Sequence, residues 1–127
     1  MADGRSGHRP RGPAAVARAA RWSWQGLCSA WRHESSFRLE VYLLVLLLPL
    51  GIWLGNSPVE KVLLTGCLVP VLAMELVNSA IEALIERYGP QWHPLAGMAK
   101  DMGSAAVMLL MLNVVLCWML ILLPRLA

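Results

Sequence analysis

The sequence predicts an all-α integral membrane protein with three transmembrane helices and an N-terminal amphipathic surface helix. Of its 127 residues, 57% are apolar, which exceeds the usual share in a soluble globular domain. The apolar residues gather in three blocks, and each block with its flanks reaches the ~20 residues needed to cross a bilayer. These blocks are residues 41–54, 62–85 and 103–123. So short a chain is expected to form one domain.

The chain is expected to begin with a disordered tail over residues 1–13, which are rich in glycine, arginine and proline. The three-span domain then covers residues 14–127. Its first element is a predicted helix over residues 14–33 that combines arginines with tryptophans. This combination favours an amphipathic helix lying at the membrane interface. A solvated helix packed on the bundle is the alternative.

The first span is predicted over residues 38–54, with Pro49 expected to bend it. The Gly-Asn-Ser-Pro turn at residues 55–58 then closes a tight hairpin. A hairpin this short places the start of the second helix directly beside the end of the first.

The second span is predicted over residues 59–87, with a kink at Pro70 and a stop at the Tyr-Gly-Pro sequence of residues 88–90. Residues 91–102 are polar enough to form a connection or a half-helix. The third span, residues 103–123, is the most uniformly apolar of the three. No internal repeat and no second domain are expected.

The basic residues predict the orientation. Nine of them fall on one side of the predicted spans and two on the other. Cytoplasmic loops carry an excess of lysine and arginine, so the N-terminus and the 86–102 loop are expected in the cytoplasm. The net charge of +3 then reflects topology and contact with anionic lipid rather than nucleic acid. The nine are Arg5, Arg9, Arg11, Arg18, Arg21, Arg32, Arg38, Arg87 and Lys100, and the two are Lys61 and Arg125.

Three polar residues inside the second span, Glu75, Asn78 and Glu82, lie on one helical face. A charged side chain at the centre of a spanning helix costs about 2.5–3.5 kcal/mol on insertion scales. The two carboxylates are about 10 Å apart along the axis, too far to share a proton. We therefore expect separate roles: Glu75, the deeper one, as a general base, and Glu82 as a ligand near water and cations. An enzyme and a proton-conducting oligomer both fit this pattern.

Further charged residues flank the predicted cytoplasmic boundary. Glu34 precedes the first span, and Lys100 and Asp101 precede the third. Glu34 and Glu82 would offer oxygen ligands to a divalent cation if the surface helix folds back on the bundle. Lysine suits phosphate as a point charge, so the set favours phosphoryl transfer to or from a lipid. The phosphate-binding and catalytic motifs of soluble kinases are absent from the sequence.

Two segments resemble the small prokaryotic diacylglycerol kinases: Glu-Leu-Val-Asn-Ser-Ala-Ile-Glu at residues 75–82 and Ala-Lys-Asp-Met-Gly-Ser-Ala-Ala-Val at 99–107. Matches within residues 23–40 extend the resemblance, which covers about residues 18–123. It implies a homotrimer that phosphorylates diacylglycerol to phosphatidic acid with ATP and Mg²⁺. The reaction would take place at the cytoplasmic face of the bacterial inner membrane.

The resemblance also implies residue roles. Glu75 matches the catalytic base, and Glu34 and Glu82 match the carboxylates that hold Mg²⁺ with the ATP phosphates. The positions that match nucleotide contacts are Trp22, Glu34, Asn78, Glu82, His93, Lys100 and Asp101. The positions that match lipid contacts are Ala19, Ser23, Trp24, Ala30, Trp31, Phe37, Arg38, Glu40, Glu75 and Ser104. Departures from the family pattern occur at Ala15, Trp22, Leu39, Pro94 and Met98.

Other interpretations remain open at the level of sequence. Relatives of the same family phosphorylate undecaprenol, which would keep the mechanism and change the lipid. A proton-conducting oligomer would use Glu75 and Glu82 as a relay and would not need Mg²⁺. A purely structural membrane subunit would tolerate replacement of Glu75 by glutamine.

Overall fold

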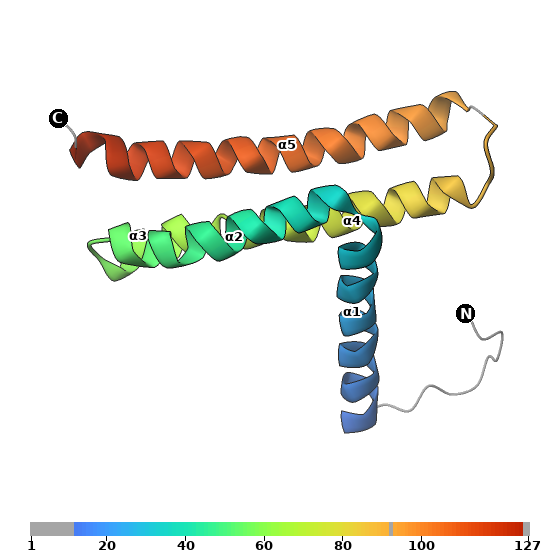
Figure 1. Cartoon of the computed structure of the whole chain (residues 1–127), viewed down its shortest axis with the longest axis horizontal. Helices are drawn as coiled ribbons and strands as arrows, with labels where there is room; N and C mark the ends of the chain where they lie inside the picture. Colours follow the sequence, from blue (N-terminus) through green and yellow to red (C-terminus); the bar gives the residue numbers. More distant parts are fainter. Residues whose placement is uncertain (1–11, 92, 126–127) are drawn as a thin grey trace.

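The computed structural model describes residues 12–91 and 93–125, and within these ranges every regular element is helical. Three helical segments are long and apolar enough to cross a membrane: Ser35–Leu54, Pro58–Glu86 and Pro94–Arg125. The prediction of an all-helical chain with three such segments is confirmed. Figure 1 shows the three segments lying roughly parallel to one another, with a further helix extending to one side.

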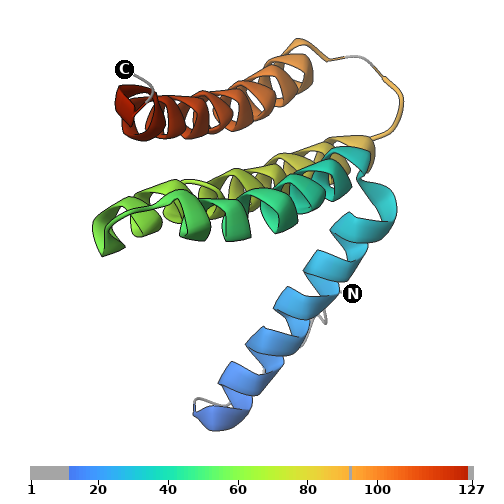
Figure 2. The same ribbon diagram turned by 60° about the vertical axis from the view of Figure 1, so that its left-hand side comes forward.

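That further helix is α1 (Pro13–His33), which begins with a proline in its first turn. It points away from the bundle in Figures 1 and 2 and meets α2 at a sharp corner. Ala30 is its buried residue, whereas Trp22 and Trp24 are exposed. Most of the predicted tail, residues 1–11, lies outside the described residues.

The corner between α1 and α2 (Ser35–Leu54) is held by Arg38. Its guanidinium donates hydrogen bonds to the carbonyl oxygens of Trp31 (2.9 Å) and Arg32 (3.3 Å). These carbonyls belong to the last turn of α1, where the helix cannot satisfy them itself. The Trp31 ring also packs edge-to-face on Tyr42 at a centroid distance of 5.7 Å. The first helix apolar enough to span a membrane starts at Ser35, three residues before the predicted residue 38.

Pro49 lies inside α2 without ending it, and two glycines then bring the chain into a tight hairpin. A Cβ at Gly51 would lie 3.2 Å from the side chains of Leu64 and Thr65. A Cβ at Gly55 would lie 2.9 Å from the backbone nitrogen of Lys61. The two helices approach this closely only because these positions carry no side chain.

The second transmembrane segment consists of two helices, α3 (Pro58–Gly66) and α4 (Val69–Glu86), separated by a turn at Cys67 and Leu68. The sequence predicted a kink in one helix at Pro70. The structure instead places Pro70 in the first turn of α4, where its missing N–H costs no hydrogen bond. The helix therefore breaks just before the proline.

The break frees the carbonyl oxygen of Leu64, a residue that is fully buried. The indole nitrogen of Trp118 donates to this oxygen at 3.1 Å, and the Cys67 thiol donates to it at 3.4 Å. A backbone carbonyl at membrane depth needs such partners because lipid tails offer none. The third transmembrane helix thus stabilises the irregularity in the second.

The third segment, α5 (Pro94–Leu122), continues into a short 3₁₀ turn, η1 (Leu123–Arg125). The sequence predicted a span starting at residue 103 and a connection or half-helix before it. The structure joins both parts into one helix that starts at Pro94. The His93 ring caps its first turn by accepting a hydrogen bond from the backbone nitrogen of Leu95 (3.2 Å). The polar residues within 94–102 led to the later predicted start, but they do not end a helix.

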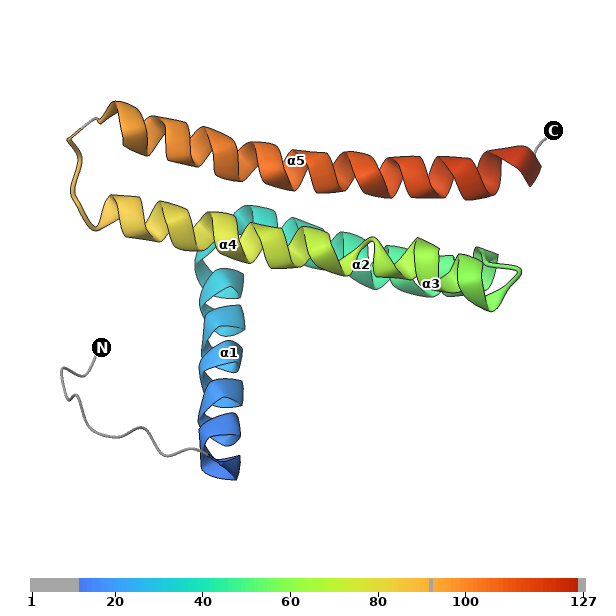
Figure 3. The same ribbon diagram turned by 180° about the vertical axis from the view of Figure 1, so that it is seen from behind.

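Helix α5 runs antiparallel beside α4, while α2 lies beside α3 and α4 (Figure 3). The core between them is small, because many apolar residues of α2 and α5 remain exposed in this chain. The buried apolar residues are Ala30, Phe37, Leu64, Cys67, Leu68, Val71 and Val107.

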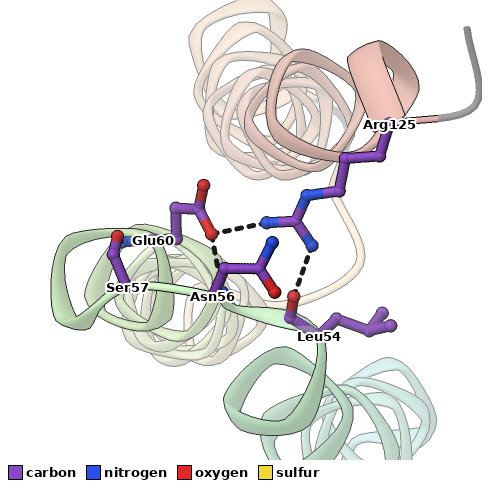
Figure 4. Close-up of polar contacts among 5 residues, drawn as sticks. All are labelled: Leu54, Asn56, Ser57, Glu60 and Arg125. Atoms are coloured by element: carbon purple, nitrogen blue, oxygen red, sulfur yellow. Dashed lines mark hydrogen bonds and ion pairs between the residues drawn. The ribbon is translucent and has the colours of Figure 1, made fainter.

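The hairpin end is closed by Arg125 (Figure 4). Its guanidinium donates to the backbone oxygen of Leu54 and pairs with the Glu60 carboxylate. The same carboxylate accepts from the backbone nitrogen of Asn56 (2.7 Å), and the Ser57 hydroxyl accepts from that of Glu60 (3.2 Å). This network fixes the end of α5 on the turn between α2 and α3.

Candidate active site

The buried carboxylate Glu75 is the centre of the candidate site. Helix α4 presents Glu75 on its packed face, where the residue is 5% exposed. Its carboxylate interacts electrostatically with those of Glu34 and Glu82, and that of Glu40 interacts with it in turn. Glu40 lies on α2 and is 6% exposed. The structure therefore gathers around Glu75 three acidic residues that the sequence analysis had singled out.

Glu34 reaches this cluster because it occupies the corner between α1 and α2, where its backbone is extended. The helix α1 itself does not fold back on the bundle, because it points away from it (Figure 2); only the corner residue Glu34 comes near the other carboxylates. A groove of about 770 Å³ runs between α1 and α4 beside Glu34. It is lined mainly by small and apolar residues, with Ser79 and Glu86 among its polar ones.

Three buried side-chain atoms of this region have no hydrogen-bond partner among the described residues: Glu40 Oε2, Asn78 Oδ1 and Ser79 Oγ. Buried polar groups are normally paired, so each exception needs an explanation. Glu40 and Asn78 are among the predicted site residues, whereas Ser79 is not. Its spacing of four residues from Glu75 already placed it on the same helical face.

Glu40 also borders a second cavity, of about 250 Å³, between α2, α4 and α5. The other residues that line this cavity are apolar, and they include Leu47, Val71 and Met111. Among the residues that the structure describes, the Glu40 carboxyl group is therefore the one ionisable group lining this otherwise apolar cavity.

Helix α5 adds the basic part of the site. The Lys100 ammonium lies 3.8 Å from the Glu82 carboxylate, and both side chains are partly exposed. Asp101 and Ser104 follow on α5 and are exposed. One turn after Lys100, the buried Gly103 lies against Asn78.

Several predicted site residues lie away from this cluster or have structural contacts. Ala19, Trp22, Ser23 and Trp24 are exposed positions along α1. Phe37 is buried, and the remaining predicted positions at the corner, Ala30, Trp31 and Arg38, also contribute to packing or capping there. His93 caps α5. The structure therefore brings Lys100 and four of the predicted carboxylates into one cluster, but not all of the predicted contact residues. The four are Glu34, Glu40, Glu75 and Glu82.

Glu34 and Glu82 are the predicted ligands of Mg²⁺. Across residues 12–91 and 93–125, no group of three histidine, cysteine or acidic residues lies close enough to hold a metal ion by itself. Glu34 and Glu82 offer hard oxygen donors, which suit Mg²⁺, an ion that usually binds one or two carboxylates and completes its shell with phosphate and water oxygens. The residues present fit that mode of binding.

Three helical segments long and apolar enough to cross a membrane, with an acidic cluster beside a lysine, define a small helical protein of the membrane class with a polar site on its second segment. A sequence model of the family described as "Prokaryotic diacylglycerol kinase" matches residues 21–122. The chain belongs to the prokaryotic diacylglycerol kinase family.

Similar curated relatives carry the same name. The diacylglycerol kinase of Escherichia coli strain K12 is 40% identical over 107 residues, which cover 84% of this chain and 88% of the relative. That of Haemophilus influenzae is 40% identical over 100 residues, covering 79% and 85%. That of Pseudomonas aeruginosa is 39% identical over 108 residues, covering 85% and 88%.

Proposed function

We propose that this protein transfers the γ-phosphoryl group of ATP to the free hydroxyl of diacylglycerol and so forms phosphatidic acid. The observation that carries the proposal is the buried Glu75, whose carboxylate interacts electrostatically with those of Glu34 and Glu82. A carboxylate held among like charges and away from water is suited to accept a proton. The names of the relatives supply the lipid and the reaction class.

In the proposed reaction, Glu75 takes the proton from the lipid hydroxyl as its oxygen bonds to the γ-phosphorus. The bond between that phosphorus and the β–γ bridging oxygen breaks, and ADP leaves. Phosphoryl transfer depends mainly on positioning and charge stabilisation, so few protein groups are required. Asn78 and Ser79, on the same face of α4, offer hydrogen bonds to the reacting groups.

Glu34 and Glu82 would hold Mg²⁺ together with the ATP phosphates. The ion, when bound, neutralises charge that develops on the phosphate oxygens. Lys100, now paired with Glu82 at 3.8 Å, lies where it would contact a phosphate as a point charge. Trp22, Asn78, His93 and Asp101 complete the proposed nucleotide contacts.

The lipid would approach from the bilayer side of the same cluster. We propose α1 as an amphipathic helix on the cytoplasmic surface of the inner membrane, because its tryptophans are exposed and its basic residues are numerous. Glu40 borders an otherwise apolar cavity and interacts electrostatically with Glu75, so we propose that the lipid enters there. The proposed lipid contacts are Ala19, Ser23, Trp24, Ala30, Trp31, Phe37, Arg38, Glu40, Glu75 and Ser104.

A homotrimer is the proposed assembly. Exposed apolar residues on α2 and α5 offer surfaces for lipid and for other copies of the chain. An arrangement shared between subunits would bring α1 residues that lie away from the cluster in one chain close to the cluster of another.

Transfer of labelled phosphate from ATP in mixed micelles tests the proposal. Diacylglycerol and undecaprenol are offered separately, with and without Mg²⁺, to the wild type and to Glu75→Gln. We expect Mg²⁺-dependent label in phosphatidic acid with the wild type and none with the variant. Preference for undecaprenol would overturn the substrate. No transfer to either lipid by the folded protein would overturn the kinase proposal in favour of a proton path.

A further inference from the structure

Gly103 on α5 lies directly against the Asn78 side chain on α4 within the candidate site. A Cβ built at Gly103 would overlap with Asn78 Oδ1 and lie 3.3 Å from Asn78 Cγ. Ordinary close contacts between carbon and oxygen are about 3.3–3.6 Å. Gly103 is also buried, so a side chain at this position could not turn towards solvent. A Cβ at this position would therefore displace the Asn78 amide, whereas the Asn78 Cα would stay at an ordinary contact distance of 3.8 Å.

The same contact lies one turn from the ion pair of the site. Asn78 and Glu82 are four residues apart on α4, and Lys100 and Gly103 are three apart on α5. Because the helices are antiparallel (Figure 3), the Asn78–Gly103 contact and the Glu82–Lys100 pair form two successive levels of one interface. The contact between Asn78 and Gly103 is therefore the interhelical contact one turn away from the Glu82–Lys100 pair.

The glycine on the other side of Lys100 gives a contrast within the same helix. A Cβ built at Gly97 would meet nothing within 4 Å. Gly97 and Gly103 thus share helix α5 and flank Lys100 at equal spacing in the sequence. Only Gly103 is constrained by a neighbour.

We propose that Gly103 is a positioning residue: its missing side chain seats the Asn78 amide against α5 and thereby sets the register between Glu82 and Lys100. The inference deepens the proposed function, because it names the device that aligns the carboxylate helix with the helix of the phosphate-binding lysine. Asn78 Oδ1 has no hydrogen-bond partner among the described residues, so close packing rather than hydrogen bonding holds that oxygen.

A zero-length cross-link tests the register without relying on activity. A water-soluble carbodiimide activates the Glu82 carboxyl group, and the Lys100 amine displaces the activated group to form an amide; the water removed converts the carbodiimide into a urea. Both side chains are accessible for this reaction, at 32% and 44% exposure. Peptide mass spectrometry then measures the yield of the Glu82–Lys100 link in the wild type, Gly97→Ala and Gly103→Ala.

We expect the yield to fall severalfold in Gly103→Ala and to stay at the wild-type level in Gly97→Ala. The double variant Asn78→Ala/Gly103→Ala should recover the link, since the obstructing amide is gone. If position 103 required glycine for a reason unrelated to Asn78, the double variant would not recover the link. A wild-type yield in Gly103→Ala, or no recovery in the double variant, would overturn the proposal. If Gly103→Ala does not fold, the double variant Asn78→Ala/Gly103→Ala decides the proposal: we expect it to fold and to form the link, and its failure to do so would overturn the proposal.

Kinetics supply the second readout. A displacement of about 1 Å in an active site can reduce catalysis about 10²-fold, and we expect that loss in kcat/KM for ATP in Gly103→Ala, with a raised KM. The double variant should remain slow, because Asn78 belongs to the proposed site. Failure of the wild type to phosphorylate diacylglycerol would refute the substrate proposal and leave the cross-linking result to decide the register by itself.

Discussion

The polar groups at the two ends of the helical hairpin differ in whether they have hydrogen-bond partners. At the turn between α2 and α3, Arg125 and Glu60 bond to each other and to backbone groups (Figure 4). Around Glu75, the carboxylates of Glu34, Glu40 and Glu82 each interact electrostatically with that of Glu75, and Glu40 Oε2 is buried with no hydrogen-bond partner among the described residues. Paired polar groups hold an end of a structure together. Buried polar groups without partners lower stability, and at membrane depth they mark functional sites.

The comparison predicts that replacements at the Glu75 end reduce activity without reducing stability, while replacements at the hairpin end do the reverse. Three experiments test this division and a fourth tests the break between α3 and α4, in order of decreasing effect.

The largest effect is expected from Glu75→Gln. Loss of the proton acceptor should reduce phosphoryl transfer at least about 10²-fold, the lower limit for a general base. ATP binding should be nearly unchanged because Glu34, Glu82 and Lys100 remain. The fold should not weaken, since one of several mutually repelling charges is removed. Phosphate transfer, nucleotide binding and thermal unfolding in micelles measure the three quantities. A parallel loss of ATP affinity would contradict this assignment of roles.

Glu82→Gln should raise the Mg²⁺ concentration needed for half-maximal activity. The expected change is about 10–100-fold, the range seen when a group supporting a metal site is removed. Glu86→Gln, one turn further along α4 and exposed, is the matched control and should leave the titration unchanged. Identical Mg²⁺ titrations for Glu82→Gln and the wild type would remove Glu82 from the metal site.

At the hairpin end, Gly55→Ala should lower the free energy of unfolding by about 1–3 kcal/mol, as overpacking does. The added Cβ would lie 2.9 Å from the backbone nitrogen of Lys61, which cannot move without opening the turn. Gly66→Ala is the control, because a Cβ there meets nothing within 4 Å. SDS titration in micelles gives the unfolding free energy. Equal stability of the two variants would show that the close approach is unimportant.

The smallest effect is expected from Trp118→Phe, which deletes the hydrogen bond to the Leu64 carbonyl at the break between α3 and α4. The loss should be about 0.5–1 kcal/mol, in line with single hydrogen bonds between membrane helices. The same titration measures it. Cys67 still donates to that carbonyl, so the double variant Cys67→Ala/Trp118→Phe should lose more than the sum of the single variants. A strictly additive result would argue against a shared acceptor.

Local features of the fold were predictable because they depend on short stretches of sequence. The apolar blocks gave the three long helices, and the hairpin turn followed from the Gly-Asn-Ser-Pro sequence. Predictions that relied on polarity or on a single proline were less accurate. Helix α5 begins at Pro94 rather than residue 103, since Lys100 and Asp101 are compatible with a helix that extends beyond the membrane. The helix breaks before Pro70, and the carbonyl that the break frees accepts a hydrogen bond from Trp118, a residue distant in sequence.

The sequence by itself determined which residues are costly to bury: Glu75, Asn78 and Glu82 on one face of an apolar helix. Only the tertiary structure decided what surrounds them. It brought Glu34 and Glu40 to Glu75, set Lys100 beside Glu82 and seated Asn78 on Gly103. Helical periodicity fixes the face on which a side chain lies, whereas its neighbours depend on how helices far apart in the chain pack together.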